Sequence, residues 1–174
     1  ARKSAYMGFG EIYWNNATPA ASETTANANQ MTKTSKLDQD GDGYFETVMK
    51  TSTLIDGSVK TAITETKTDG TVKANGSFRM SHDGSTTVLE KDSNNDGVVD
   101  YIETSIRMTS GAVVQMAVTK SAAGVDTETR ATNVDAFGSI LTSITKDASG
   151  RKIADQNKLA DGTSARLTYV AESG

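Results

Sequence analysis

Hydrophobic and polar residues alternate in short segments along most of the chain. In the clearest cases an apolar residue or a threonine stands at every second position. These residues are Ile102, Thr104, Ile106 and Met108 in one segment, and Val114, Met116 and Val118 in the next. Because successive side chains of a β-strand point to opposite faces, these positions predict the buried face of a sheet. Elsewhere we expect Thr and Ala to carry that face, as near Thr61 and from Thr127 to Thr132. No apolar stripe of helical period is present, so helices are not expected.

Glycine-centred turns separate these segments at nearly constant intervals. The turn glycines are Gly43, Gly57, Gly70, Gly84, Gly97, Gly111, Gly124, Gly138, Gly150 and Gly162. The first eight are separated alternately by 14 and 13 residues, and the last two follow at 12. Asp-Gly between β-rich segments is a strong hairpin signal, because type I′ turns and glycine bulges both need a positive φ.

The repeat predicts an all-β protein. Ten turns imply about eleven strands, joined as an antiparallel meander that is built from 27-residue hairpin units and is elongated or rolled. The lack of proline after residue 36 suits continuous strand pairing. A β-solenoid with two strands in each 27-residue coil is the alternative, although such coils do not reverse through two-residue turns.

The chain divides into three parts by composition. Residues 1–16 hold four of the ten aromatic residues, among them Tyr6 and Trp14, and predict a strand that caps the sheet or an arm that packs on a neighbouring subunit. Residues 17–36 are polar and predict a flexible connector. Residues 37–174 form the β-hairpin repeat domain.

Composition narrows the chemistry that is available. The chain has no cysteine and one histidine, so thiolate metal sites and disulfides are excluded. Its formal net charge of −4, without a basic stripe, gives no indication of nucleic-acid binding. No run of about 20 apolar residues is present to span a membrane. Apolar residues make up only 36% of the chain, so we expect a thin core that is stabilised by repeat stacking, bound ions or neighbouring subunits.

Two turns, 54 residues apart, carry acid-rich loops. Aligned at that offset, they share the pattern D-x-[DN]-x-D-G-x-x-[DE], which places oxygen ligands at alternate positions around a bend, as calcium requires. The predicted ligands are Asp38, Asp40, Asp42, the carbonyl of Tyr44 and Glu46 in the first loop, and Asp92, Asn94, Asp96, the carbonyl of Val98 and Asp100 in the second. The alternative is that these residues are only solvated turn residues.

The second loop also satisfies the complete EF-hand pattern, with Glu103 at its twelfth position. The equivalent residue of the first loop is Met49, and the flanking segments are β-branched, so we expect EF-like loops on β-hairpins. Turns that are four apart lie at the same end of a meander, which would place the two sites roughly 19 Å apart. The third loop of the series, which begins at Asp147, lacks these ligands, and no ion is predicted there.

No catalytic constellation is evident. His82 stands beside an Asp-Gly turn and is expected to be solvent-exposed, and the clustered carboxylates are already assigned as ion ligands. Glycine-rich phosphate-binding loops are absent. An enzyme is therefore not expected.

Asp-Gly hairpins interspersed with D-x-D-x-D-G loops resemble the repeat tracts of large secreted or surface-attached bacterial proteins. The segment Asp147-Ala-Ser-Gly-Arg-Lys is similar to the D-x-x-G-R core of YD/Rhs repeats, although Lys146 stands where that family has tyrosine. The resemblance implies an extracellular, calcium-loaded scaffold or adhesin.

The sequence thus favours a non-enzymatic structural or adhesive repeat protein at the cell surface, in a fibre or matrix. Self-association is expected, with the segment from Tyr6 to Trp14 as one contact. One alternative is a virion or filament subunit that assembles through this N-terminal arm. Another is a carbohydrate-binding module, which would need an exposed aromatic platform.

Overall fold

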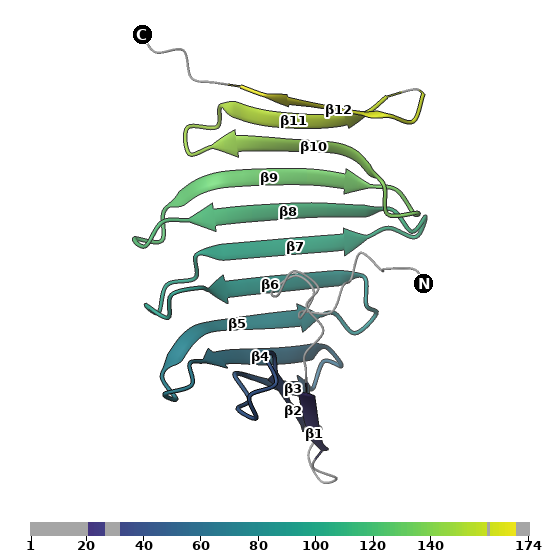
Figure 1. Cartoon of the computed structure of the whole chain (residues 1–174). Helices are drawn as coiled ribbons and strands as arrows, with labels where there is room; N and C mark the ends of the chain where they lie inside the picture. The colour runs from purple at the N-terminus through teal and green to yellow at the C-terminus, as the bar shows by residue number, and fades with distance from the viewer. Residues whose placement is uncertain (1–20, 27–31, 160, 170–174) are drawn as a thin grey trace.

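A computed structural model of the chain describes residues 21–26, 32–159 and 161–169. These residues form one β-sheet (Figure 1). Its strands are β1 (Ala21–Ala26), β2 (Thr32–Asp38), β3 (Thr47–Thr53), β4 (Val59–Thr66), β5 (Val72–Met80), β6 (Thr86–Asp92), β7 (Tyr101–Arg107), β8 (Val113–Lys120), β9 (Asp126–Val134), β10 (Ile140–Asp147), β11 (Lys152–Lys158) and β12 (Ser164–Thr168).

The twelve strands lie in chain order, and each pairs antiparallel with the next. The predicted meander is confirmed, and the parallel pairing that a β-solenoid needs does not occur among the described strands. The sheet is open, because β1 and β12 are not paired with each other.

The sheet begins earlier in the chain than the sequence predicts. The ten predicted turns join eleven strands, β2 to β12, as expected, but β2 starts at Thr32 and β1 lies entirely within the predicted connector. β1 pairs with β2 from Ala21 opposite Asp38 to Ala26 opposite Lys33. Backbone ladder bonds do not require apolar side chains, so the polar composition of this segment does not prevent strand pairing.

The turns follow one hydrogen-bonding scheme. At the β3–β4 turn, the Gly57 amide donates to the Leu54 carbonyl at 2.9 Å, and the Leu54 amide donates to the Ser58 carbonyl at 2.8 Å. The same pair of bonds recurs at Gly70, Gly111, Gly124, Gly138, Gly150 and Gly162. In each of these seven turns only the glycine has a positive φ, between 76° and 87°. These are type I turns closed by a glycine bulge, since a type I′ turn would need two such residues in succession.

The buried face differs from the one that the apolar alternation predicts. Ile106 and Met116 share one face of β7 and β8 and are 43% and 47% exposed. Ser105, Val113 and Ala117 lie on the opposite face and are buried. This face continues the one that carries the buried Leu89, because Leu89 stands opposite Glu103 and Glu103 stands opposite Ala117. The short side chain of Ala117 is screened on it by its longer ladder neighbours Glu103 and Arg130.

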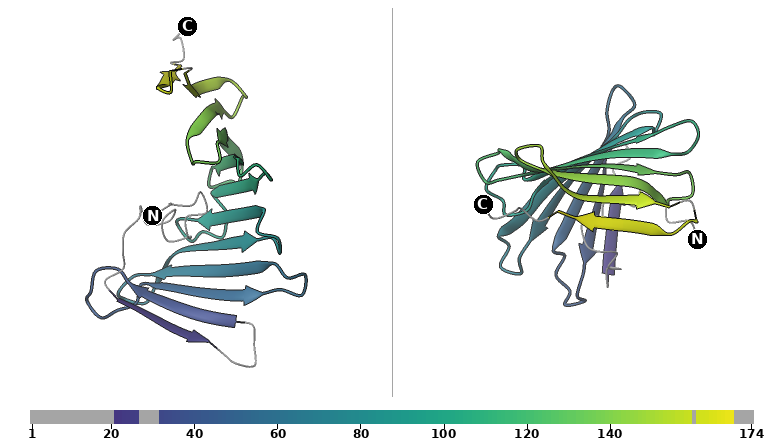
Figure 2. Two further views of the ribbon diagram at one scale, coloured as in Figure 1. Left: turned by 90° about the vertical axis from the view of Figure 1, so that its right-hand side faces the viewer. Right: turned by 90° about the horizontal axis from the view of Figure 1, so that it is seen from above.

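A hydrophobic cluster lies toward the N-terminal half of the sheet. Ile63 on β4 and Leu89 on β6 are buried, and Met49, Phe78 and Tyr101 pack against them. Met49 stands opposite Ile63, and Phe78 stands opposite Leu89, so the cluster is made of cross-strand pairs. The strands twist progressively along the sheet (Figure 2).

No helix of the described residues is long and apolar enough to cross a membrane.

Candidate metal centre

The first acidic loop connects β2 to β3 and is organised by its first residue. Asp38 is the last residue of β2, and its side chain is 2% exposed. One of its carboxylate oxygens accepts a hydrogen bond from the Gly41 amide at 2.7 Å, and the other accepts one from the Gly43 amide at 3.0 Å. Both glycines have a positive φ, which bends the loop around the Asp38 carboxylate.

The remaining acids of the loop are held by backbone amides in the same way. The Asp42 amide donates to Asp40 at 3.1 Å, and the Tyr44 amide donates to Asp42 at 2.7 Å. Glu46 reaches back to accept a hydrogen bond from the Gln39 amide at 3.0 Å. The Glu46 carbonyl accepts a hydrogen bond from the Thr66 amide of β4 at 2.7 Å, which fixes the end of the loop to the sheet.

These contacts bring four carboxylates together. One oxygen from each of Asp38, Asp40, Asp42 and Glu46 lies within 4.8 Å of the others. The second oxygen of Glu46, Oε1, is buried and has no hydrogen-bond partner. None of the ion pairs found among the described residues includes these acids. Four negative charges at this separation repel one another, and a bound cation would remove that repulsion.

The donor set is entirely oxygen, which is the ligand type that hard cations prefer. The structure therefore shows an acidic cluster that can hold a metal ion, formed by four of the residues that the sequence predicts. The hydroxyl of Tyr44 is hydrogen-bonded to Thr66 at 3.0 Å, whereas the assignment of its backbone carbonyl as a ligand stays a prediction.

The second acidic loop, between β6 and β7, has the same backbone scheme. Asp92 is buried and accepts hydrogen bonds from the amides of Asp96 and Gly97 at 3.2 and 2.9 Å. The Val98 amide donates to Asp96 at 2.8 Å. Asn95 takes the place of Gly41 and is the one non-glycine residue of the described chain with a positive φ, at 57°. The 54-residue repeat is thus preserved in three dimensions.

The second loop nevertheless does not gather its acids as the first loop does. The Asn94 side-chain amide donates to Asp96 at 3.0 Å. Asp100 is engaged by the amide and the hydroxyl of Ser93, at 2.9 and 3.0 Å. In the described part of the chain, only the first loop places three or more carboxylates within reach of one ion. Asn94 stands where the first loop has Asp40, so the second loop has one charge fewer and an amide that donates to a candidate ligand.

Glu103, the twelfth residue of the EF-hand pattern, lies in β7 opposite Leu89 and Ala117. Its carboxylate accepts a hydrogen bond from the Tyr101 hydroxyl at 2.6 Å. Burial of Tyr101 and this contact with Glu103 raise the pKa of the Tyr101 hydroxyl. Glu103 belongs to no carboxylate group with the loop acids. The EF-like pattern therefore sits on a β-hairpin, and its twelfth residue is part of a strand.

Two other residues that the sequence singles out have local roles. Asp147 accepts hydrogen bonds from the amides of Ser149 and Arg151, both at 3.0 Å, and pairs with the Arg151 side chain. His82 is exposed in the β5–β6 turn, and its Nδ1 lies 3.4 Å from the carbonyl oxygen of Gly57 in the neighbouring β3–β4 turn. The N-terminal aromatic segment lies outside the described residues.

No protein-family model, curated protein or solved structure matches this chain.

Proposed function

We propose that this chain is a non-enzymatic, extracellular repeat protein whose open β-meander is stabilised by calcium and serves in a surface fibre, matrix or adhesin. The observation that carries the proposal is the group of four carboxylate oxygens within 4.8 Å of one another in the β2–β3 loop. Calcium takes six to eight oxygen ligands in flexible geometry, which suits a loop that supplies several carboxylates. The role is structural, because the loop joins two strands of a thinly cored sheet.

The test is thermal unfolding with calcium and with EDTA. At a calcium concentration about 100 times the dissociation constant, binding adds about 2.7 kcal/mol to the free energy of unfolding. We expect Asp42→Asn to abolish this gain. Asp69→Asn is the matched control, because it removes one charge from an ordinary turn outside the acidic loops. Identical melting curves with calcium and EDTA would contradict the ion site.

The same experiment separates the two loops. We expect Asp96→Asn to reduce the calcium-dependent gain less than Asp42→Asn does, because the side chains of Asn94 and Ser93 already donate hydrogen bonds to the acids of the second loop. Calorimetric titration then gives the number of ions bound. A larger effect of Asp96→Asn would place the principal site in the second loop.

A filament subunit is the second candidate, and the open sheet favours it. β1 and β12 each have one strand neighbour, so each leaves one row of backbone groups unpaired within the described sheet. Such edges are templates for pairing with another chain. If the N-terminal arm makes the assembly contact, deletion of residues 1–16 abolishes filaments in electron micrographs and leaves the far-ultraviolet circular dichroism unchanged. Filaments that persist after this deletion would assign assembly to the sheet edges.

A further inference from the structure

A polar groove lies on one face of the C-terminal half of the sheet. Its volume is about 560 Å³, and its lining comes from β8 to β12. The strand register places Arg130 in one row with Thr145, Ala154 and Thr168, and Arg166 in the next row with Thr132, Ser143 and Gln156. Arginines from β9 and β12 therefore flank a floor of short side chains on β10 and β11, and the short floor leaves the hollow.

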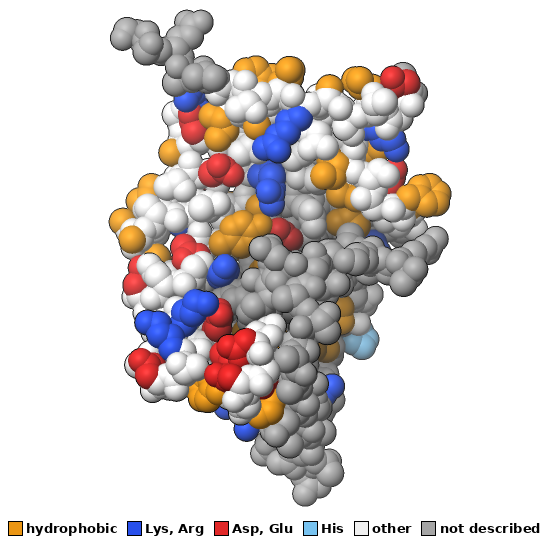
Figure 3. Space-filling view, in the orientation of Figure 1, with side chains coloured by type: hydrophobic (Ala, Val, Ile, Leu, Met, Phe, Trp, Pro, Cys, Tyr) orange, Lys and Arg blue, Asp and Glu red, His pale blue; other side chains and the backbone are white. Residues whose placement is uncertain are grey.

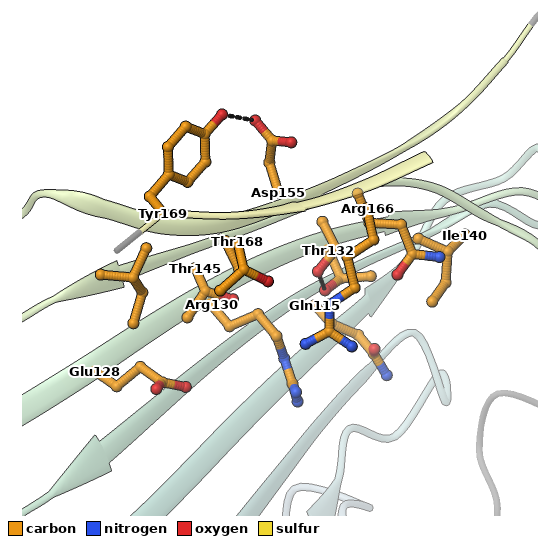
Figure 4. A pocket seen from close by; sticks show the side chains of 14 residues that line it. Gln115, Glu128, Arg130, Thr132, Ile140, Thr145, Asp155, Arg166, Thr168 and Tyr169 are labelled. Atoms are coloured by element: carbon orange, nitrogen blue, oxygen red, sulfur yellow. Dashed lines mark hydrogen bonds between the residues drawn. The ribbon is translucent and has the colours of Figure 1, made fainter. Parts of the chain in front are cut away.

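The two arginines extend to the same side of the sheet (Figure 4). Neither takes part in an ion pair found among the described residues. Arg130 makes one long contact, 3.5 Å, with the Tyr101 hydroxyl. Both side chains are exposed, and Figure 3 shows basic side chains gathered over β9 to β11 on this face. Two guanidinium groups without carboxylate partners can bind the planar carboxylate of a ligand through paired hydrogen bonds.

The acids that line the groove limit the charge of its ligand. Asp155 is engaged by Lys152 at 3.0 Å and by the Tyr169 hydroxyl at 2.9 Å, on the other side of the strands from the arginines (Figure 4). Glu128 is the one other carboxylate of the lining. Two positive charges and one negative charge thus face the hollow. This balance suits a ligand that places one negative group in the hollow, with any further acid group outside it, because Glu128 would repel a second one inside.

The rest of the lining is rich in neutral hydrogen-bonding groups. Gln115 and Gln156 offer amides, and the Thr132 and Ser143 hydroxyls are hydrogen-bonded to each other at 2.9 Å on the floor. The two amides and the Glu128 carboxylate can form hydrogen bonds with hydroxyl groups, and the two arginines can bind an acid group. A suitable ligand is therefore built of units that each carry several hydroxyl groups and one acid group. A sugar acid has this chemistry, whereas inorganic phosphate or sulfate has no hydroxyl-bearing ring for the amides.

We propose that this groove binds a carboxylated saccharide. The sugar carboxylate lies between Arg130 and Arg166, and ring hydroxyls donate to Glu128 and exchange hydrogen bonds with Gln115 and Gln156. Recognition is polar and uses no aromatic platform. The groove is independent of the proposed cation site, because the β2–β3 loop lies six strands away from β9 in the sheet order.

The experiment is calorimetric titration of the full chain with a galacturonic acid tetrasaccharide, with cellotetraose and sodium sulfate as the other arms. The buffer contains no added calcium, so that calcium does not bridge the acid groups, and no chelator, because the carboxylates of EDTA would compete for the arginines. We expect binding of the acidic sugar alone. Arg130→Gln and Arg166→Gln should each weaken it about tenfold, the effect of losing one charged hydrogen-bonding partner. Arg79→Gln, which changes an exposed arginine on β5, should leave the affinity unchanged.

Three results would overturn the proposal. Equal binding of cellotetraose would show a neutral sugar surface, equal binding of sulfate would show a general anion site, and no binding of the tetrasaccharide would exclude the ligand class. Circular dichroism of each variant checks the fold. Arg130→Lys and Arg166→Lys keep the charge but lose the paired hydrogen bonds, so an affinity equal to that of the unchanged chain would also contradict the geometry.

Discussion

At the residue scale, Gly57 combines a positive φ with a close neighbour. Its φ is 77°, and a Cβ at this position would stand 2.3 Å from Nδ1 of His82. A left-handed conformation costs a side-chain-bearing residue about 1–2 kcal/mol. We expect Gly57→Ala to lower the free energy of unfolding by that amount, with a further loss from displacement of the His82 ring. Urea unfolding measures both.

A matched variant separates the two causes. Gly70 has a φ of 82° and nothing within 4 Å of its position for a Cβ, so Gly70→Ala reports the backbone cost alone. In a His82→Ala background, Gly57→Ala should cost as much as Gly70→Ala. If Gly57→Ala has no effect in that background, the positive φ at this turn is wrong.

The sequence predicts which residues of the two acidic loops are equivalent, but it does not predict the role of each side chain. The 54-residue offset places Asp92 on Asp38 and Asp96 on Asp42, and each pair shares one equivalent backbone donor, Gly97 for Gly43 and Val98 for Tyr44. The sequence pattern does not reveal that Asn94 donates to Asp96, since an amide satisfies the pattern either as a ligand or as a donor. The side-chain rotamer decides between these roles.

At the scale of the element, four Asp-Gly turns share a second hydrogen-bonding pattern. In each turn a Ser or Thr comes directly after the glycine. The aspartate before the glycine accepts hydrogen bonds from both the backbone amide and the hydroxyl of that Ser or Thr. The pairs are Asp56 with Ser58, Asp69 with Thr71, Asp83 with Ser85, and Asp161 with Thr163. Each turn thus depends on an ionised carboxylate as well as on its glycine.

These hydrogen bonds to aspartate make the stability of the turns depend on pH in the acidic range. The hydroxyl of Ser81, with the amide and hydroxyl of Ser85, lowers the pKa of Asp83 from 3.8 to about 2. Because the folded pKa lies below the unfolded one, the stabilisation is present above pH 3.8 and is lost as the pH falls toward about 2. We expect the free energy of unfolding to fall through this interval. The pKa values of Asp56, Asp69 and Asp161 are lowered in the same direction.

Unfolding in urea at a series of pH values from 5 downward checks this prediction. Asp83→Asn keeps a side-chain acceptor and removes the titrating group, so its stability should decline less between pH 4 and 2. A decline equal to that of the unchanged chain would assign the acid sensitivity to other groups.

At the scale of the whole molecule, the glycine spacing predicts the topology because it fixes where the chain reverses. It does not predict which face is buried, since Ile106 and Met116 carry the apolar alternation of β7 and β8 and yet lie on the exposed face. The start of the sheet was also missed, because the polar sequence of residues 21–36 shows no apolar alternation, whereas backbone ladder bonds do not depend on apolar side chains. The groove between Arg130 and Arg166 was missed because its two arginines come from strands that are not adjacent.

An open sheet of consecutive hairpins should have uneven local stability. Each strand is paired only with its neighbours in the chain, and the packed cluster of Ile63 and Leu89 lies between β3 and β7. β12 has one strand partner, and four of its five side chains are exposed. Local opening costs least where few apolar contacts are lost. We therefore expect amide hydrogen exchange to be slowest in β4 to β6 and to become faster toward β12.

Calcium should change this gradient at one place. Removal of a cation from the β2–β3 loop restores repulsion among its four carboxylates, so exchange should accelerate in β2 and β3 while β9 to β12 keep their rates. Exchange followed by mass spectrometry, with calcium and with EDTA, resolves these strands. Equal amide exchange rates in all strands would contradict the predicted gradient, because they would show that the sheet opens as one unit. An acceleration spread over every strand in EDTA would contradict a local ion site, because the loop joins β2 to β3 and is hydrogen-bonded to Thr66 of β4, far from β9 to β12 in the sheet order.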